Sequence, residues 1–405
     1  MWISQLWVRR LNFVALMLAT FLTPYLLYGF SFLFDRVPPL NDVLLYGYWL
    51  QQMQLGEPLF GLTQDFVYPY PSLLPMWLAQ VLGGPAGILV GWTTLIALLN
   101  TLAIGILTSW GRGGRGPMMA GVFWVTFLLL LGPSGIGRID AVAAAVSVFG
   151  LAALARERIA LAVALFSFGA WIKIWPFALA VSKFVADKRK QVIALTALAS
   201  TVAVLIFAMA AGANDSLFSF VFKQGNRGIQ VESPIAMIWI WAAKLGAHDT
   251  GIYYDREIIT NQVFGPMVDL FAQLMTPIMF AALGITVWLG YRAKKAGTPG
   301  NTVFAVMAFT AVLDLIVFNK VGSPQFMAWL AVPMMALIIY EVPRLRIPVV
   351  GLLILAATTN LIYPVFYIDL MGLGDLSVGL LTIRNVLLIA MLVYANLRLS
   401  ELTRK

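Results

Sequence analysis

The 405-residue chain has no cysteine, only one histidine and few charged residues, which make up 11% of the sequence. Without cysteine it has no thiolate nucleophile, no thiolate metal site and no disulfide framework. Hydrophobic residues make up 61%, and the 26 Phe, 13 Trp and 13 Tyr are too many for a disordered or collagen-like chain. This composition is typical of an integral membrane protein and leaves little sequence for a soluble domain.

Long apolar stretches predict an all-α polytopic fold with about 12 transmembrane helices, each needing about 20 residues. The stretches run over 11–34, 86–109, 117–132, 139–155, 159–172, 174–187, 191–211, 264–290, 302–318, 326–341, 347–367 and 378–397. Only Arg156–Arg158 and Lys173 before Pro176 interrupt the run from 139 to 187, so the number of helices between 139 and 211 stays open. Residues 1–405 are expected to form a single membrane domain.

The net charge of +9 is distributed unevenly between the alternate connections of this predicted bundle. One set of connections, together with both termini, carries 18 Lys and Arg and four Asp and Glu, whereas the other carries nine and 14. Basic connections are retained in the cytoplasm, so both termini should face it, and no nucleic-acid partner is needed to explain the charge. The first stretch follows Arg9-Arg10, is too long for a signal-peptide core and lacks a small-residue cleavage site, so we expect it to remain as an anchor.

Two long segments, 35–85 and 212–263, fall on the other, outer side and are rich in Pro, Trp, Tyr and polar residues. Ordered loops of this length are usually functional. The two halves of the chain show no convincing repeat, which disfavours the common transporter architectures.

The first outer segment predicts two juxtamembrane helices. Residues 43–55 place apolar side chains at helical spacing, as in an interfacial helix, with Tyr46 and Trp49 suited to the headgroup level. A proline turn over 65–72 leads to the second helix at 73–82.

Asn41 or Asp42 stands where the N-cap of the first of these helices belongs. A side-chain cap would satisfy amides of the first turn and contribute about 1 kcal/mol. A carboxylate held at a helix start beside the bilayer could instead act as a general base. Spacing alone leaves both interpretations open.

An ordered set of motifs resembles the GT-C glycosyltransferases, in particular glycosyltransferase family 87. The set begins with an aspartate followed by an aromatic interfacial helix, Asp42–Trp49, and a Tyr-x-Tyr-Pro turn before the second span, Tyr68–Pro71. Three later segments complete it: Ile172–Pro176, Asn226–Ser233 and Asn319–Gln325. The resemblance covers most of the chain as a pattern rather than as close identity. That family includes actinobacterial α-1,2-mannosyltransferases and arabinofuranosyltransferases that use polyprenyl-phosphate sugars at the outer face of the membrane.

The resemblance implies that Asp42 is the base of an inverting displacement and takes the proton of the acceptor hydroxyl. Asp35 and Asp65 are weaker candidates. Many GT-C enzymes have an acidic pair at this point, but here a single Asp stands next to Asn41, which leaves the metal requirement open. Mannose is the expected sugar, ahead of arabinofuranose, because Arg227–Ser233 is more similar to the mannosyltransferases.

Outward cations that flank or interrupt apolar segments are the candidates to hold the donor phosphate, because Lys and Arg form short charge-assisted bonds to phosphate. The residues assigned to this role are Lys173, Lys320, Arg227 and Arg138. A cation inside an apolar helix costs about 2.5–3.5 kcal/mol on insertion scales, so it normally has a partner or a task. Lys173, between Trp171 and Trp175, is the sharpest candidate.

Each of these cations also has a structural interpretation. Lys173 could snorkel to the headgroups, and Arg138 could pair with Asp140. Arg384 could pair with Asp375 or Asp369. Lys223 also flanks an apolar segment, and the cations expected in solvated loop positions are Arg36, Lys244 and Arg256.

Sugar or acceptor contacts are expected from Gln230, Glu232, Asp314 and Tyr68. The first two lie with Arg227 in a glycine-containing segment, a mixture typical of loops that hydrogen-bond a polyol. The alternative for that segment is an ordinary polar outer loop. Asp314, six residues before Lys320, could equally form a buried pair with it.

Metal and cofactor sites are not indicated. His248 stands alone in a polar loop, so no zinc site is expected, and any divalent ion would need Asp or Glu with water. Gly111–Gly116 looks like a phosphate loop but follows a membrane span and lacks the Lys-Ser/Thr ending, so it predicts a basic cytoplasmic turn. The expected partners are a polyprenyl-phosphate sugar, a glycolipid or polysaccharide acceptor and membrane lipids.

A transporter or flippase for a lipid-linked or polar solute is the rival interpretation. It would explain the many helices and the charges at Lys173, Asp314 and Arg384. It would leave the two long outer segments and the interfacial helix unexplained. In a transporter the charges should gather at the bilayer midplane, whereas in an enzyme Asp42 should lie with basic residues at the outer surface.

Overall fold

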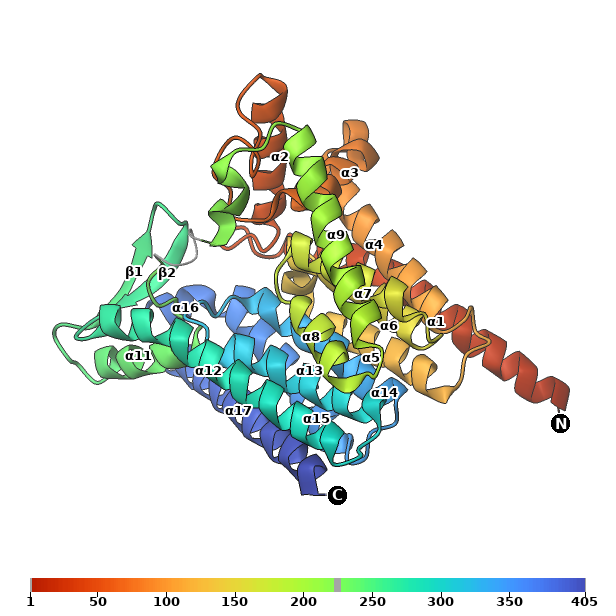
Figure 1. The fold of residues 1–405 in the computed structure, drawn as a ribbon. Helices are drawn as coiled ribbons and strands as arrows, with labels where there is room; N and C mark the ends of the chain where they lie inside the picture. The colour runs from red at the N-terminus through yellow and green to blue at the C-terminus, as the bar shows by residue number, and fades with distance from the viewer. Residues whose placement is uncertain (1, 222–226, 405) are drawn as a thin grey trace.

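Every one of the predicted apolar stretches is helical in the computed structural model, which describes residues 2–221 and 227–404 (Figure 1). The corresponding helices are α1 (Trp2–Ser31), α4 (Ile88–Leu107), α5 (Arg115–Leu131), α6 (Ile139–Leu154), α7 (Ile159–Ile172), α8 (Phe177–Ala186), α9 (Lys190–Ala210), α12 (Val268–Lys295), α13 (Gly300–Val317), α14 (Met327–Ile339), α15 (Arg346–Asn360) and α17 (Asp375–Glu401). Lys223 and the start of the segment 224–233 lie outside the described residues.

In the part of the chain that the structure describes, eight helices are long and apolar enough to cross a membrane: α1, α4, α5, α9, α12, α13, α15 and α17. The helices α6, α7, α8 and α14 are shorter, between 10 and 16 residues. These elements agree with an all-α membrane protein, but the expected number of about 12 crossings is not confirmed.

The break between α7 and α8 has a local cause. Lys173 ends α7 with an extended backbone (φ −153°, ψ 128°), and α8 begins directly after Pro176. Proline lacks the amide hydrogen that would continue the helix and disfavours helical geometry in the residue before it. The lysine is therefore placed at a helix end rather than along a helix face.

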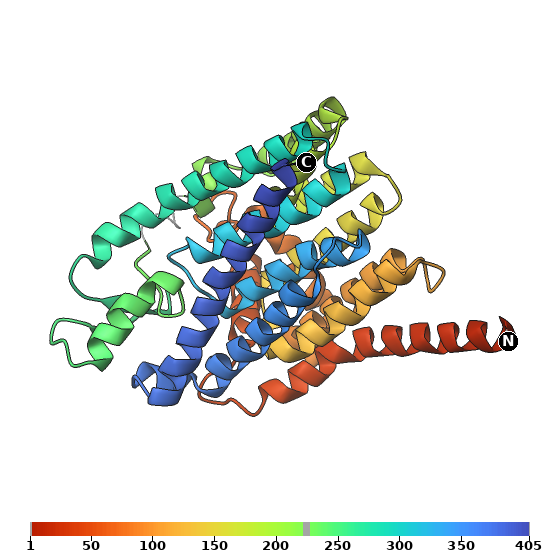
Figure 2. The same cartoon turned by 90° about the horizontal axis from the view of Figure 1, so that it is seen from below.

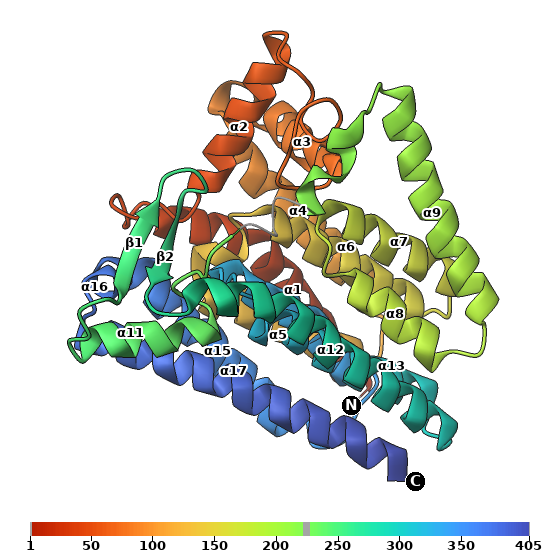
Figure 3. The ribbon, with the colours of Figure 1, turned by 60° about the vertical axis from the view of Figure 1, so that its left-hand side comes forward.

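The start of α1 and the C-terminus lie at one end of the bundle, here called the terminal end (Figures 1 and 3). Short basic connections gather there. In one of them Thr298 donates a hydrogen bond to the carbonyl of Leu402 (2.9 Å), and in another Arg344 forms an ion pair with Glu401 (3.3 Å). The two long segments lie away from it, at what we call the loop end.

The first long segment contains α2 (Asn41–Gln54), the short 3-10 turn η1 (Tyr70–Ser72) and α3 (Leu73–Gly83). Both predicted helices are therefore present. The N-cap of α2 is Leu40, and no side chain caps this end, so the capping role considered for Asn41 and Asp42 is wrong.

Tyr46, which the sequence suggested for the headgroup level, is fully buried within the protein. Its ring packs with Trp49 (ring centroids 5.8 Å apart) and with Tyr68 (6.4 Å). Phe60 and Phe66 complete this aromatic cluster. Aromatic packing holds α2 against the proline turn, because rings of this size bury large areas in fixed edge-to-face geometries.

The second long segment contains a β-hairpin, which the sequence pattern did not predict. Strand β1 (Gly251–Asp255) pairs antiparallel with β2 (Thr260–Phe264), and Gln230 forms an isolated bridge with Gln262. Aromatic and β-branched residues in both strands favour this structure. The helix α11 (Met237–Lys244) packs beside it, and α16 (Tyr367–Met371) closes the same region (Figure 3).

The core lies in α6, α13 and α14, in which nearly every residue is buried. The peripheral helix α9 instead exposes large apolar side chains, including Leu195, Ile206 and Phe207. In the view from below, α1 and α12 lie at opposite edges of the bundle (Figure 2). Such extensive apolar exposure is unfavourable in water and suits a lipid environment.

Replacing Gly91 with Ala should destabilise the contact between α3 and α4. A Cβ at this position would overlap the Ala79 carbonyl oxygen and the backbone of Gly83. Because backbone atoms cannot rotate away, we expect a loss of about 1–3 kcal/mol or more, measured as a lower thermal unfolding midpoint in detergent. Gly284→Ala is the control, since a Cβ there meets no atom within 4 Å. Equal midpoints for the two variants would contradict the close packing.

Candidate active site

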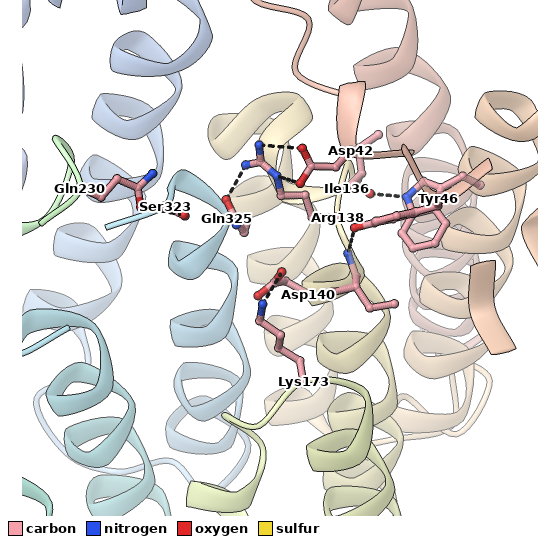
Figure 4. Close-up of polar contacts among 11 residues, drawn as sticks. Asp42, Tyr46, Ile136, Arg138, Asp140, Lys173, Gln230, Ser323 and Gln325 are labelled. Carbon is pink, nitrogen blue, oxygen red and sulfur yellow. Dashed lines mark hydrogen bonds and ion pairs between the residues drawn. The ribbon is translucent and has the colours of Figure 1, made fainter. Parts of the chain in front are cut away.

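Asp42 and Arg138 form an ion pair at the loop end (Figure 4). Arg138 Nε donates to Asp42 Oδ2 (2.6 Å) and Nη2 donates to Oδ1 (3.3 Å), while Nη1 donates to Gln325 Oε1 (2.5 Å). The Asp42 side chain is 32% exposed and that of Arg138 is 14% exposed. The arginine therefore orients the carboxylate, which stays accessible to another molecule.

Two hydrogen bonds beside this ion pair connect the elements that carry it. The Tyr46 hydroxyl, one helical turn after Asp42, accepts a hydrogen bond from the Ile139 amide (3.0 Å). Trp92 Nε1 donates to the Ile136 carbonyl (2.7 Å). A side chain from α2 thus satisfies the first amide of α6, which a helix leaves without a partner, and a side chain from α4 satisfies a carbonyl of the connection just before it.

Lys173 lies between a buried carboxylate and an aromatic ring. Its Nζ is 4.0 Å from Asp140 Oδ2 and 4.6 Å from the centre of the Tyr68 ring. Asp140 Oδ1 accepts a hydrogen bond from Trp329 Nε1 (2.7 Å). Asp140 therefore neighbours Lys173, and the pairing of Arg138 with Asp140 that the sequence suggested is wrong, because Arg138 bonds to Asp42 instead.

Two further cations belong to this region, Arg227 beside Lys173 and Lys320 beside Arg227. Arg227 interacts electrostatically with both Lys173 and Lys320, and also with Tyr68. Burial lowers the pKa of the Arg227 guanidinium and of the Lys320 ammonium. We call Lys173, Arg227 and Lys320 the cation cluster. Like charges in a partly buried group are unfavourable, so the cluster favours a bound anion.

Tyr68 neighbours both the ion pair and the cation cluster. It interacts electrostatically with Asp42, Arg138 and Arg227, and the Lys173 ammonium lies 4.6 Å from the centre of its ring. Burial, followed by the nearby Asp42 charge, raises the pKa of Tyr68. The phenol therefore stays protonated near neutral pH and can donate a hydrogen bond, but it cannot serve as a base.

Gln230 joins two segments beside the cluster rather than projecting freely. Its backbone amide donates to the Lys320 carbonyl (2.9 Å). Its side-chain Oε1 accepts from the Gly322 backbone amide (3.2 Å) and from the Ser323 hydroxyl (3.1 Å) (Figure 4). The side-chain carbonyl of Gln230 therefore connects its own segment to residues 322 and 323. Glu232 follows in the same segment and is 3% exposed, and burial raises the pKa of its carboxyl.

Arg384 is buried in α17 and fixes the same two segments. It donates to the carbonyls of Glu232 (2.5 Å) and Gly322 (3.1 Å). Its predicted pairing with Asp375 or Asp369 is wrong, because Asp375 pairs with Lys244 (2.5 Å). Lys244 is accordingly ion-paired at the surface, because the Asp375 side chain is 98% exposed.

Asp314 lies outside this site. It is 1% exposed and accepts a hydrogen bond from Thr286 (2.6 Å), so it packs between α12 and α13 rather than pairing with Lys320. The other loop acids considered as bases, Asp35 and Asp65, are exposed, as are Arg36, Arg256 and His248.

Three residues of the site were not assigned a role there by the sequence: Asp140, Gln325 and Tyr363. Tyr363 lies 5.7 Å from the Arg138 guanidinium. Gln325 is within the motif Asn319–Gln325, which was a usable signal. Asp140 was considered only as a partner of Arg138, because sequence proximity favoured that pair.

No protein-family model, no curated protein and no solved structure matches this chain. Its chemistry is therefore interpreted from the side chains themselves. Within residues 2–221 and 227–404, no three His, Asp or Glu side chains converge as metal ligands would. An accessible carboxylate and a cation cluster around one tyrosine can accept a proton and stabilise an anion at neighbouring positions.

Removing the Tyr46 hydroxyl should weaken the fold at the site. In Tyr46→Phe the Ile139 amide would lose its acceptor in a buried position, which costs about 1–3 kcal/mol. We expect a lower thermal unfolding midpoint. Tyr48→Phe is the matched control two residues later, because Tyr48 is 54% exposed. Wild-type stability of Tyr46→Phe would show that this hydrogen bond does not hold α2 on α6.

Proposed function

We propose that the protein is a GT-C-type membrane glycosyltransferase, which transfers a sugar from a polyprenyl-phosphate donor to an acceptor hydroxyl. The observation that carries the proposal is that an accessible carboxylate, Asp42, and the cations Lys173 and Arg227 all neighbour Tyr68, with the Lys173 ammonium 4.6 Å from the centre of its ring. The motifs shared with glycosyltransferase family 87 support it, since the base implied there is the same Asp42.

Each part of the site matches one requirement of the reaction. The bond between the sugar carbon and the phosphate oxygen breaks while the acceptor oxygen bonds to that carbon from the opposite face, which inverts it. Asp42 takes the acceptor proton. The leaving lipid phosphate gains negative charge, which Lys173, Arg227 and Lys320 stabilise. Tyr68 donates a hydrogen bond to the sugar or to the acceptor.

Arg138 takes a different role from the one expected of it. Its donors are directed to Asp42 and Gln325, so it orients the base and is removed from the phosphate-binding set. Gln230 likewise supports the segment that carries Arg227. Glu232, expected as a sugar contact, is only 3% exposed, so the proposed mechanism gives it no contact with substrate.

The membrane orientation follows from the charges. The terminal end carries the basic connections, so it faces the cytoplasm, and the loop end with its site faces outward. A polyprenyl tail would lie in the bilayer beside the apolar helices while its phosphate reaches the cation cluster. Mannose is the favoured sugar and arabinofuranose the second, with a glycolipid or polysaccharide as acceptor.

Asp42→Asn tests the base directly, because it keeps the shape of the side chain and removes its basicity. We expect transfer to fall about 10²–10⁴-fold with nearly unchanged donor binding, measured with radiolabelled polyprenyl-phosphate mannose and arabinofuranose on membranes carrying the protein. Asp35→Asn is compared in parallel, since Asp35 is exposed in the same segment. Full activity of both Asp42→Asn and Asp42→Ala would remove Asp42 from the mechanism.

Arg227→Met tests the phosphate site. Losing the cation between Lys173 and Lys320 should lower kcat/KM for the donor about 10²–10³-fold, as for loss of one donor to a developing anion. Lys244→Met serves as control, because this cation of the loop end is held by Asp375 and the Leu373 carbonyl. Equal effects of the two substitutions would speak against a specific phosphate site. If the wild-type protein transfers sugar from no donor, the transporter or flippase interpretation takes precedence.

A further inference from the structure

Asp140 is the buried acid of the site. It is 1% exposed, against 32% for the Asp42 side chain, and its Oδ1 is occupied by the hydrogen bond from Trp329. An acceptor hydroxyl could not reach such a carboxylate, so Asp140 is not a second base. Its position two residues after Arg138, at the start of α6, places it beneath the ion pair (Figure 4).

The other carboxylate oxygen faces Lys173. Among the described residues, Asp140 Oδ2 has no hydrogen-bond partner, and it lies 4.0 Å from Lys173 Nζ. An ionised carboxylate buried without full hydrogen bonding is costly, and a nearby cation offsets that cost. The ammonium is therefore attracted toward Asp140 at a distance longer than a hydrogen bond.

Without this attraction, the neighbouring cations would repel the Lys173 ammonium from its position. The neighbouring charges of Arg227 and Arg138 repel the ammonium, whereas the ring face of Tyr68 and the carboxylates of Asp140 and Asp42 attract it. Its side chain is 16% exposed, so a phosphate can still contact it. At 4.0 Å the attraction of Asp140 limits the position of Nζ while its N–H groups remain available to a ligand.

We propose that Asp140, itself anchored by Trp329, is a positioning residue that holds the Lys173 ammonium where it binds the donor phosphate. Asp140 touches no substrate and acts only through Lys173. This inference rests on the proposed function. It adds Asp140, a residue that belongs neither to the sequence motifs nor to the ion pair between Asp42 and Arg138. It also assigns a task to Trp329, which stacks on Trp175 (ring centroids 5.9 Å apart) and Phe326 (4.0 Å).

A double-mutant cycle tests the inference, with Asp140→Asn, Lys173→Met and the double variant in lipid nanodiscs. Two quantities are measured: kcat/KM for the polyprenyl-phosphate sugar, and the affinity for a short-chain polyprenyl phosphate without sugar. We expect Asp140→Asn to lower both about 10–100-fold, as outer residues that orient a ligand do. In the Lys173→Met background the same substitution should change them less than about twofold, because its effect passes through the lysine. If the double variant loses the product of the two single-variant losses in both measurements, the inference is overturned.

A second substitution guards against failure of Asp140→Asn to fold. Trp329→Phe keeps the aromatic stack but removes the hydrogen bond to Asp140, so it should give a smaller loss that again disappears with Lys173→Met. A Trp329→Phe loss that persists with Lys173→Met would count against the proposal. Asp314→Asn is the matched control, since Asp314 is equally buried but bonds to Thr286 away from the site. A loss with Asp314→Asn as large as with Asp140→Asn would overturn the specific role of Asp140.

The two measurements separate this inference from the proposed function. A wild-type protein that transfers no sugar would refute the glycosyltransferase, while the phosphate-binding cycle would still decide whether Asp140 acts through Lys173. A wild-type protein that transfers sugar, with independent effects of Asp140 and Lys173, would refute only the positioning role.

Discussion

The ion pair between Asp42 and Arg138 organises the loop end of the protein. It joins the start of α2 to the start of α6, 96 residues later, and through Gln325 it reaches the connection before α14. A partly buried pair of this kind is tolerated because both partners make several hydrogen bonds and one remains accessible to water. Once this pair forms, the segment that carries the carboxylate and the helix that carries Asp140 cannot move independently.

Charge balance explains the remaining arrangement. Arg138 pairs with Asp42, whereas Arg227 interacts with the like charges of Lys173 and Lys320 as well as with Asp255, and Lys173 faces Asp140. Mutual repulsion between partly buried cations makes an anionic ligand favourable there. The segment 229–233 is fixed against 320–323 by Gln230 and Arg384, which keeps Arg227 and Lys320 together.

The helices could be predicted from the sequence because hydropathy is a local property: each apolar stretch became a helix with shifts of a few residues at most boundaries. The candidate residues were also largely recognisable, since charges within apolar sequence are costly and therefore informative. Partners were not predictable. Sequence proximity suggested Arg138 with Asp140 and Arg384 with Asp375, but helices separate residues close in sequence and bring distant ones together.

The sequence by itself determined an all-α, membrane-type chain with two long segments on one side, because composition, length and charge distribution need no knowledge of contacts. Only the tertiary structure decided which cation faces which carboxylate, that Tyr46 is buried, and that residues 251–264 form a hairpin. Those outcomes depend on packing and electrostatics between segments up to 189 residues apart, as Asp140 and Trp329 show. Interactions over such separations leave no periodic pattern in the chain.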